Sequence, residues 1–203
     1  MGAGQSTQLT EPKLAAVPAP VTLVSPKFVL PQQVTLQLLP VSVPVERYDI
    51  VDTSGELFFR VERRLVGKAS GSTLLDVDGH ALATTRCDSS GMQPLYTTSA
   101  GSDARTVLMR SRPGAGFKVS EMVHSFTDED SGKRTQVGSK AVLAQFEGAM
   151  HLLDGARETA ALLAKFQRAG DVLWVSVAAG VDIVLACVVC ILADAESTRL
   201  RKN

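Results

Sequence analysis

The sequence predicts a mainly β fold, in which one closed antiparallel β-barrel encloses an apolar helix near the C-terminus. Short apolar stretches alternate with turn residues from residue 21 onward, and one long apolar run follows near the end. The 203 residues suit a single domain, and a hydrophobic content of 45% is enough to fill a large core. We therefore expect one domain over 21–203, preceded by a flexible tail over 1–20 that is rich in Gly, Ser, Thr, Gln and Pro.

Four turn signals that run from Asp to Gly predict a meander of antiparallel hairpins. They end at Gly55, Gly79, Gly132 and Gly155. Gly supplies the positive φ that tight turns need, and Asp and Ser bond the local backbone. The Ala- and Leu-rich stretch 141–166 is composed of good helix formers, but Gly148 and Gly155 would interrupt a helix. We therefore predict strands there as well.

The apolar run over 172–193 divides at Gly180 and Asp182. We predict a strand over 172–177 and then a helix capped by Asp182. The uninterrupted apolar part of this helix, 183–193, is about 17 Å long, well short of the roughly 30 Å bilayer core. A helix that is apolar on every face must be surrounded by protein, and the predicted strands can form the container. The charged residues that follow are expected in solvent; they are Asp194, Glu196, Arg199, Arg201 and Lys202.

The same run leaves an alternative open, a scramblase-like or tail-anchored membrane protein that uses 172–193 as its span. Asp182 argues against it, because a carboxylate in mid-membrane costs roughly 2.5 to 3.5 kcal/mol.

The residue types that carry catalysis or bind metals are sparse. His80, His124 and His151 have no ligand spacing, and none adjoins a Cys or Ser in a known nucleophile motif. The stretch 76–79 lacks the third acid and the final Glu of a calcium loop. We therefore predict a protein that is not an enzyme, with no catalytic residue, no cofactor and no metal. An enzyme with a ligand in the barrel mouth is a third possibility.

Charge and cysteine usage limit the partners and the compartment. The 21 basic and 21 acidic side chains give zero net charge, so no global field favours nucleic acid. Cys87, Cys187 and Cys190 form no disulfide framework, and the last two lie in the apolar run without a second pair of metal ligands. These features favour a reducing, cytoplasmic location and no nucleic-acid partner. The oligomeric state is left open.

The N-terminus has a lipidation pattern. Gly2 follows the initiator Met, and Ser6 lies four residues later, which matches N-myristoylation. The alternative is an unmodified flexible start. One myristoyl chain binds membranes with only about 10⁴ M⁻¹, so a second signal is needed for a stable tether.

The order of these features resembles the LURP-one-related family of the tubby C-terminal-like superfamily, from about Val24 to Ala195. Three stretches carry the resemblance: 26–36, 48–61, and 170–182 with the apolar helix that follows. The resemblance implies a closed antiparallel barrel of about 12 strands around a central hydrophobic helix, shared with tubby proteins and phospholipid scramblases. Two stretches depart from the family pattern, because 97–105 lacks the aromatic and basic residues expected in the middle strands and 141–165 is unusually rich in Ala.

The resemblance implies a non-enzymatic intracellular interaction or lipid-surface-binding module, connected with defence or signalling. Its partner would be an anionic membrane lipid or a protein. Arg60 and Arg64 share one face of a predicted strand, whereas Arg63 takes the other. By analogy with tubby relatives, Arg60 and Arg64 are our candidates for a phosphoinositide head group, and a solvated outer face of the barrel is the alternative.

Overall fold

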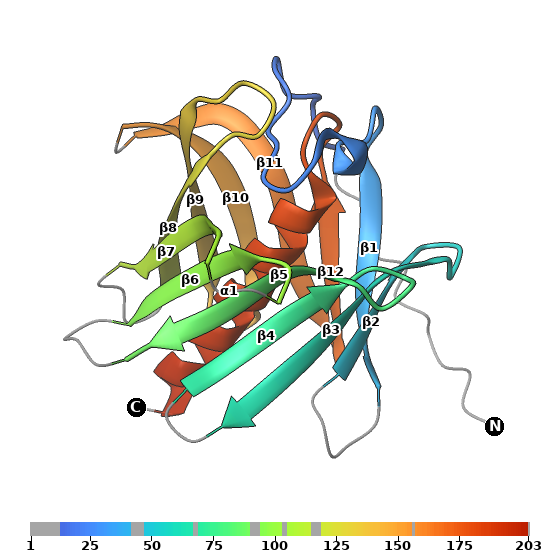
Figure 1. Ribbon diagram of the computed structural model, residues 1–203, viewed down its shortest axis with the longest axis vertical. Helices are drawn as coiled ribbons and strands as arrows, with labels where there is room; N and C mark the ends of the chain where they lie inside the picture. The colour runs from blue at the N-terminus through green and yellow to red at the C-terminus, as the bar shows by residue number, and fades with distance from the viewer. Residues whose placement is uncertain are drawn as a thin grey trace.

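The structure, a computed structural model, is a closed barrel of antiparallel strands around one α-helix (Figure 1). It describes residues 13–41, 47–66, 69–89, 94–102, 105–114, 119–155 and 157–202; the side chains of 64–66, 69–70 and 202 lie outside this description. The predicted mainly β fold with an enclosed C-terminal helix is confirmed.

The chain order is simple, with a short 3₁₀ turn, twelve strands within the described residues and then the helix. The elements are η1 (Pro26–Phe28), β1 (Val34–Val41), β2 (Arg47–Asp52), β3 (Leu57–Val66), β4 (Ala69–Leu75), β5 (Ala81–Asp88), β6 (Leu95–Ala100), β7 (Val107–Pro113), β8 (Val119–Thr127), β9 (Arg134–Val142), β10 (Glu147–Asp154), β11 (Arg157–Ala169), β12 (Val172–Val177) and α1 (Ile183–Lys202).

Each strand pairs with its neighbours in sequence, and β1 pairs with β12 to close the barrel. The β2–β3, β4–β5, β8–β9 and β10–β11 turns lie at the predicted Asp-to-Gly signals. At the β2–β3 turn, Asp52 Oδ1 accepts the backbone N–H groups of Ser54 at 2.8 Å and Glu56 at 2.9 Å, and Gly55 has φ +90°. A short carboxylate and a residue that tolerates positive φ thus form the tight connection.

The Ala-rich region forms the hairpin of β10 and β11, as predicted, and not a helix. Gly148 is required in this hairpin, because a Cβ there would meet the Lys140 carbonyl oxygen and lie 2.8 Å from the Phe166 ring. His151 lies inside β10, opposite Leu162.

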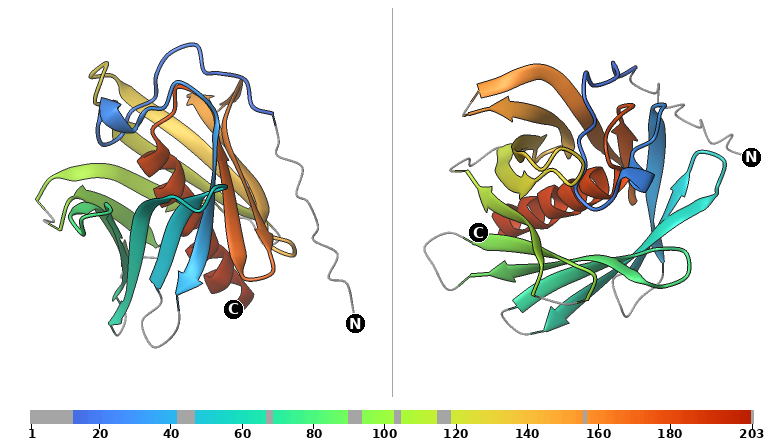
Figure 2. Two further views of the ribbon diagram at one scale, coloured as in Figure 1. Left: turned by 90° about the vertical axis from the view of Figure 1, so that its right-hand side faces the viewer. Right: turned by 45° about the horizontal axis from the view of Figure 1, so that its top comes forward.

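The helix α1 runs through the barrel from the end that we call upper, at the top of Figure 1, to the lower end (Figures 1 and 2). Every side chain from Ile183 to Ala193 is at most 4% exposed. The predicted division of the apolar run is confirmed, since β12 ends at Val177 and α1 begins at Ile183. In the structure, 172–177 form strand β12 of the wall and 183–193 lie in α1 inside the barrel, so this stretch is not one continuous apolar segment.

The helix continues beyond the apolar part, to Lys202. We expected the charged residues after Ala193 in solvent, but Asp194 is 7% exposed and Glu196 is 1% exposed. Both lie inside the lower end of the barrel, where inward-facing residues of the wall bind them. Among the described residues, no helix is both long and apolar enough to cross a membrane.

The stretch 14–33, which precedes β1 and which we call the covering segment, covers the upper end of the barrel (Figure 1). Leu14 is 8% exposed, and its N–H donates to Gln33 Oε1 at 2.7 Å. The N–H of Val17 donates to the carbonyl of Ala179 at 3.1 Å. The part of the predicted flexible tail from Leu14 onward therefore contacts the barrel, whereas residues 1–12, with Gly2, lie outside the described residues.

Candidate functional site

Asp182 connects the covering segment to the central helix. Its side chain is fully buried, and its Oδ1 caps α1 by accepting the N–H of Val184 at 2.8 Å. Its Oδ2 accepts the N–H groups of Leu23 at 3.0 Å and Val24 at 2.9 Å. Burial raises the pKa of Asp182, and these hydrogen bonds oppose the rise. One carboxylate therefore satisfies backbone donors of two separate elements.

Asp128 holds the same segment from the β8–β9 turn. Its Oδ2 accepts the N–H of Thr22 at 2.7 Å, and its Oδ1 accepts the N–H and the hydroxyl of Ser131, both at 2.8 Å. Burial disfavours the ionised carboxylate, but these hydrogen bonds outweigh it and lower the pKa of Asp128. Two carboxylates thus fix the cover of the upper end.

At the lower end, Asp194 lies between two arginines from strands of the wall that are not neighbours. Arg63 of β3 approaches Asp194 Oδ2 at 2.9 Å, and Arg168 of β11 approaches Oδ1 at 2.5 Å. The Arg63 guanidinium stacks over the Tyr48 ring at 5.0 Å, and that of Arg168 lies 5.6 Å from the Phe146 ring centre. These contacts explain why Asp194 is buried, contrary to our expectation.

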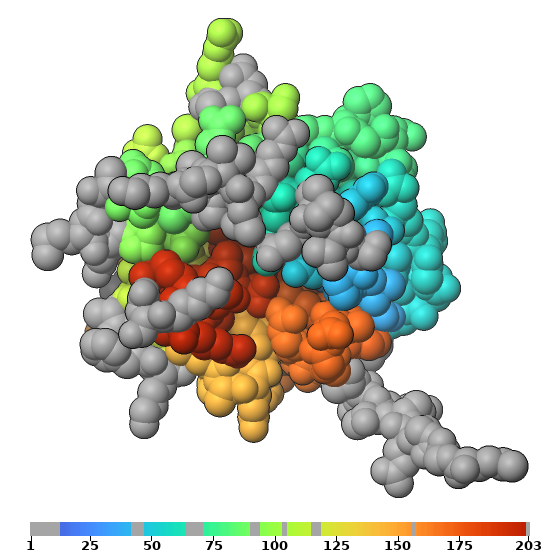
Figure 3. Space-filling view, turned by 90° about the horizontal axis from the view of Figure 1, so that it is seen from below, coloured from blue at the N-terminus to red at the C-terminus, as the bar shows by residue number. Residues whose placement is uncertain are grey.

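Glu196, two residues further, has partners as well. The hydroxyl of Tyr96 donates to Glu196 Oε2 at 2.7 Å, and Arg199 donates to both carboxylate oxygens, at 2.9 and 2.5 Å. Burial and the nearby carboxylate raise the pKa of Tyr96 well above its usual range. Figure 3 shows the end of the helix within the lower opening of the barrel. The interior acids are thus occupied by ion pairs and hydrogen bonds that hold the helix in place.

His124 is enclosed in the barrel interior. Its Nδ1 lies 2.8 Å from the hydroxyl of Ser111 on β7, and its Nε2 lies 2.9 Å from that of Ser139 on β9. Burial lowers the pKa of His124 to about 3, so the ring is neutral at physiological pH. With 0% exposure, this histidine has no surface on which a substrate could approach. Its role is to join three neighbouring strands.

One group of side chains has the composition of a metal site, at the β4–β5 turn. Ligand atoms of Asp76, Asp78 and His80 all lie within 4.8 Å of one another. However, Asp76 Oδ1 accepts the backbone N–H groups of Asp78 at 3.0 Å and His80 at 2.8 Å. The arrangement is accounted for by the hairpin turn alone.

The predicted head-group pair is only partly described. Arg60 faces outward, but its Nε lies 3.7 Å from Asp49 Oδ1, and its Nη1 lies 3.5 Å from the carbonyl oxygen of Val77. The side chain of Arg64 lies outside the described residues. Arg63 takes the opposite face of β3, as the strand alternation predicted, and points to the helix.

A different set of arginines covers the outer wall over β5 to β7, and we call Arg86, Arg110 and Arg112 the arginine face. Arg86 is opposite Thr97 on β6, and Thr97 is opposite Arg110 on β7, so the two arginines lie in one row across the strands. Arg112 follows two residues after Arg110 and shares its face. All three are exposed, and none has a carboxylate partner among the residues that the structure describes. The sequence analysis missed this set, although arginines two apart in a strand were a signal for part of it.

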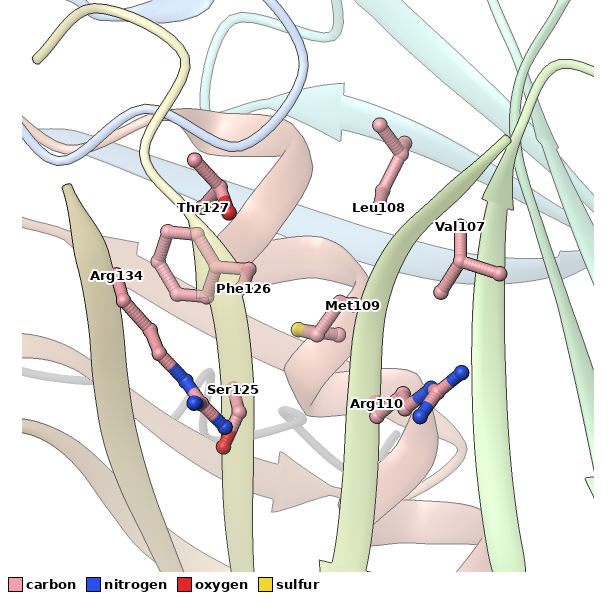
Figure 4. Close-up of a pocket in the computed structure, with 8 residues that line it drawn as sticks. All are labelled: Val107, Leu108, Met109, Arg110, Ser125, Phe126, Thr127 and Arg134. Atoms are coloured by element: carbon pink, nitrogen blue, oxygen red, sulfur yellow. The ribbon is translucent and has the colours of Figure 1, made fainter. Parts of the chain in front are cut away.

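Beside the arginine face, the barrel wall has a crevice of about 430 Å³ between β7 and β8 (Figure 4). It is lined by Val107, Leu108, Met109, Arg110, Ser125, Phe126, Thr127 and Arg134. In Figure 4, Met109 lies between the two strands, and Arg134 lies beside Ser125 on the side of β9. A second groove of about 530 Å³ follows between β9 and β10, and Arg134 lines both.

Comparisons with known proteins identify the family. A model of the LURP-one-related family matches residues 34–194. An X-ray structure of a protein from Arabidopsis thaliana is similar in fold, with a TM-score of 0.63 and 22% sequence identity, over 86% of this chain and 98% of the Arabidopsis chain. A search of curated proteins gives no match. The family match covers most of the barrel and its helix, and it confirms the resemblance that the sequence showed. The chain therefore belongs to the LURP-one-related family.

Proposed function

We propose that this chain is a non-enzymatic, cytoplasmic binding module that docks on an anionic membrane surface through the arginine face. The observation that supports this proposal is the row of exposed arginines without carboxylate partners among the described residues. Each arginine near an anionic membrane contributes about 1 kcal/mol to binding. A rigid barrel wall presents these charges without the cost of ordering a loop.

The spacing of the arginine face suits several phosphates on a surface. Arg86 and Arg110 are two strands apart, which corresponds to about 10 Å, and Arg110 and Arg112 are about 7 Å apart along β7. The guanidinium group binds phosphate oxygens with two parallel hydrogen bonds. Phosphoinositides, which carry phosphates on an exposed ring, are therefore the membrane lipids that we expect this face to prefer.

The interior chemistry supports a binding function over catalysis. Asp182, Asp194 and Glu196 all accept hydrogen bonds that have structural roles, and His124 is enclosed between two serines. A catalytic acid or base needs access to a substrate and a proton that it can give or take. These four buried groups offer neither.

The N-terminal lipidation pattern would complement the arginine face. A myristoyl group on Gly2 binds weakly by itself, and a basic surface is the usual second signal for stable association. Arg60 and Arg64, the pair proposed from the sequence, are secondary contributors in this proposal, because Arg60 already has Asp49 as a neighbour.

Sedimentation with phosphatidylcholine vesicles that contain phosphatidylinositol bisphosphate tests the proposal. We expect the unmodified full chain to bind them, and Arg110→Gln to weaken binding about fivefold, which corresponds to about 1 kcal/mol. Arg86→Gln together with Arg110→Gln should weaken it roughly 25-fold. Lys165→Gln, which removes an exposed charge from β11, is the matched control.

Two results would reject the proposal. The first is a full chain that does not sediment with these vesicles, and the second is an Arg86 and Arg110 double variant that binds as well as the Lys165 control. A myristoylated chain measured in parallel separates the two signals, since the lipid adds affinity that the arginine substitutions do not remove.

A further inference from the structure

The crevice between β7 and β8 arises from a bulge in the barrel wall. Thr98 and Ser99 of β6 are opposite Met109 and Val107, so Leu108 is an extra residue on β7. A bulge bends its strand and increases the local twist. As a result, β7 turns away from β8 at its beginning, and the wall opens there.

The opening leaves two strand edges without a rung between them. The ladder of β7 and β8 reaches its upper limit at Met109 opposite Phe126. Above that pair, Val107 pairs with β6, and Thr127 pairs with Arg134 of β9. Strand edges with unpaired backbone groups are templates for another extended chain, and a lipid tail has no N–H groups to offer them.

The side chains around these edges select for an apolar anchor with acidic neighbours. Leu108, which is half-buried, and Phe126, which is 4% exposed, supply the apolar part of the lining, together with the fully buried Met109. Arg134 is exposed at the rim beside Ser125, and it has no carboxylate partner among the described residues. Val107, at the opposite rim, is 43% exposed.

We propose that this crevice is a docking site for an extended acidic segment of a partner protein, which adds a strand at the open edge and places one apolar side chain against Leu108 and Phe126. Arg134 pairs with an acidic side chain next to that anchor. This inference goes beyond the membrane docking proposed above, because it concerns a second partner, on a surface that adjoins the arginine face and shares Arg110 with it. A volume of about 430 Å³ suits one or two apolar side chains of such a segment.

Selection of randomised octapeptides displayed on phage against the full chain is the first test. The expected peptides contain one or two apolar residues flanked by Asp or Glu. Failure to enrich any peptide above background, or enrichment of sequences without acidic residues, would overturn the proposal.

The best selected peptide, made synthetically, then tests the binding mode by calorimetry. We expect Arg134→Glu and Val107→Glu each to weaken its binding about tenfold, because each places a negative charge at the rim. Lys165→Glu, the same charge reversal on β11, should leave affinity within about twofold. A peptide N-methylated along its backbone should bind much more weakly, because it lacks the donors for strand addition.

Equal binding of the rim variants and the Lys165 control, or of the N-methylated and parent peptides, would exclude strand addition at the crevice. Phosphoinositide vesicles that displace the peptide from Arg86→Gln/Arg110→Gln protein would show that the crevice takes a lipid instead, and would equally overturn the proposal. Both variant positions in the crevice are exposed, so the barrel is expected to fold normally, which circular dichroism can verify. Vesicle binding by Val107→Glu tests the membrane proposal independently. A failure of peptide binding at the crevice can therefore be distinguished from a failure of membrane docking.

Discussion

Asp182 shows how one buried residue can serve two elements. Its two oxygens bond the first turn of α1 and the backbone of residues 23 and 24, which precede β1 by about ten positions in sequence. Burying a carboxylate without partners would cost much free energy, but three backbone donors compensate for much of the lost hydration. The cap was predictable from Gly180 and Asp182 because it is a local feature. The contact with the covering segment was not, since its partners are 158 and 159 residues away in sequence.

His124 makes the stability of the protein depend on pH. Its pKa of about 3 in the folded state lies below its ordinary value of 6.5, so the unfolded state takes up the proton first as the pH falls. Stability is therefore lost progressively from about pH 6.5 downward, by about 2 kcal/mol at pH 5. His124→Gln, which retains hydrogen-bonding groups but does not titrate, should show a smaller loss between pH 7 and pH 5 in urea unfolding. An unchanged pH dependence in this variant would show that His124 is not the titrating group.

At the scale of elements, the fit between β9, β10 and β11 depends on the absence of a side chain at Gly148. The Phe166 ring of β11 and the Lys140 carbonyl of β9 approach this position from both sides. Sequence reasoning used Gly148 correctly, as a sign against a helix, but the aromatic ring that covers it could not be inferred without the strand register.

Gly148→Ala should therefore destabilise the barrel by about 2 to 3 kcal/mol, because the Cβ overlaps backbone and ring atoms that cannot move away easily. Gly138→Ala is the matched control, since its Cβ would meet the methyl groups of Leu153, which can move. Thermal unfolding compares the two variants. Equal melting temperatures would contradict the close approach at Gly148.

Strand alternation and register also explain which parts of the site were predictable from the sequence. The strand alternation placed Arg63 opposite to Arg60 and Arg64, and the structure confirms this for Arg63. It gave no reason for Asp194 to be buried, because the partner Arg63 is 131 residues away in sequence. The row of Arg86 and Arg110 depends on the register of three strands, and the crevice depends on a single extra residue in β7. Neither can be read from spacing along the chain.

In the whole molecule, the strands form the barrel wall and the helix occupies its interior. Inward side chains of the strands and all faces of α1 from Ile183 to Ala193 share one continuous core. The apolar character of 172–193 therefore reflects burial inside the protein, as predicted from the short length of the apolar helix. The extension to Lys202 was not predicted, because the last turns depend on ion pairs with the wall.

This architecture predicts very unequal reactivity of the three thiols. Cys187 and Cys190 are fully buried, and burial raises the pKa of both well above the ordinary value, so neither should react with iodoacetamide in the native protein. Cys87 is half-buried, also with a raised pKa, and should react slowly. In urea, all three should react as the barrel unfolds. Mass spectrometry of the modified peptides is the measurement, and rapid native labelling of Cys187 would contradict a permanently enclosed helix.

The order of elements also has a consequence for synthesis on the ribosome. The helix follows every strand in chain order, and β1 must wait for β12 before the seam can close. Throughout translation, the emerging strands therefore lack both the helix and their final neighbour, so their apolar inner surfaces are exposed and prone to aggregation. A premature stop codon between residues 178 and 183 would leave a complete wall with nothing inside it. Such a product is expected to be removed by cellular quality control, so that even a short C-terminal truncation would act as a complete loss of the protein.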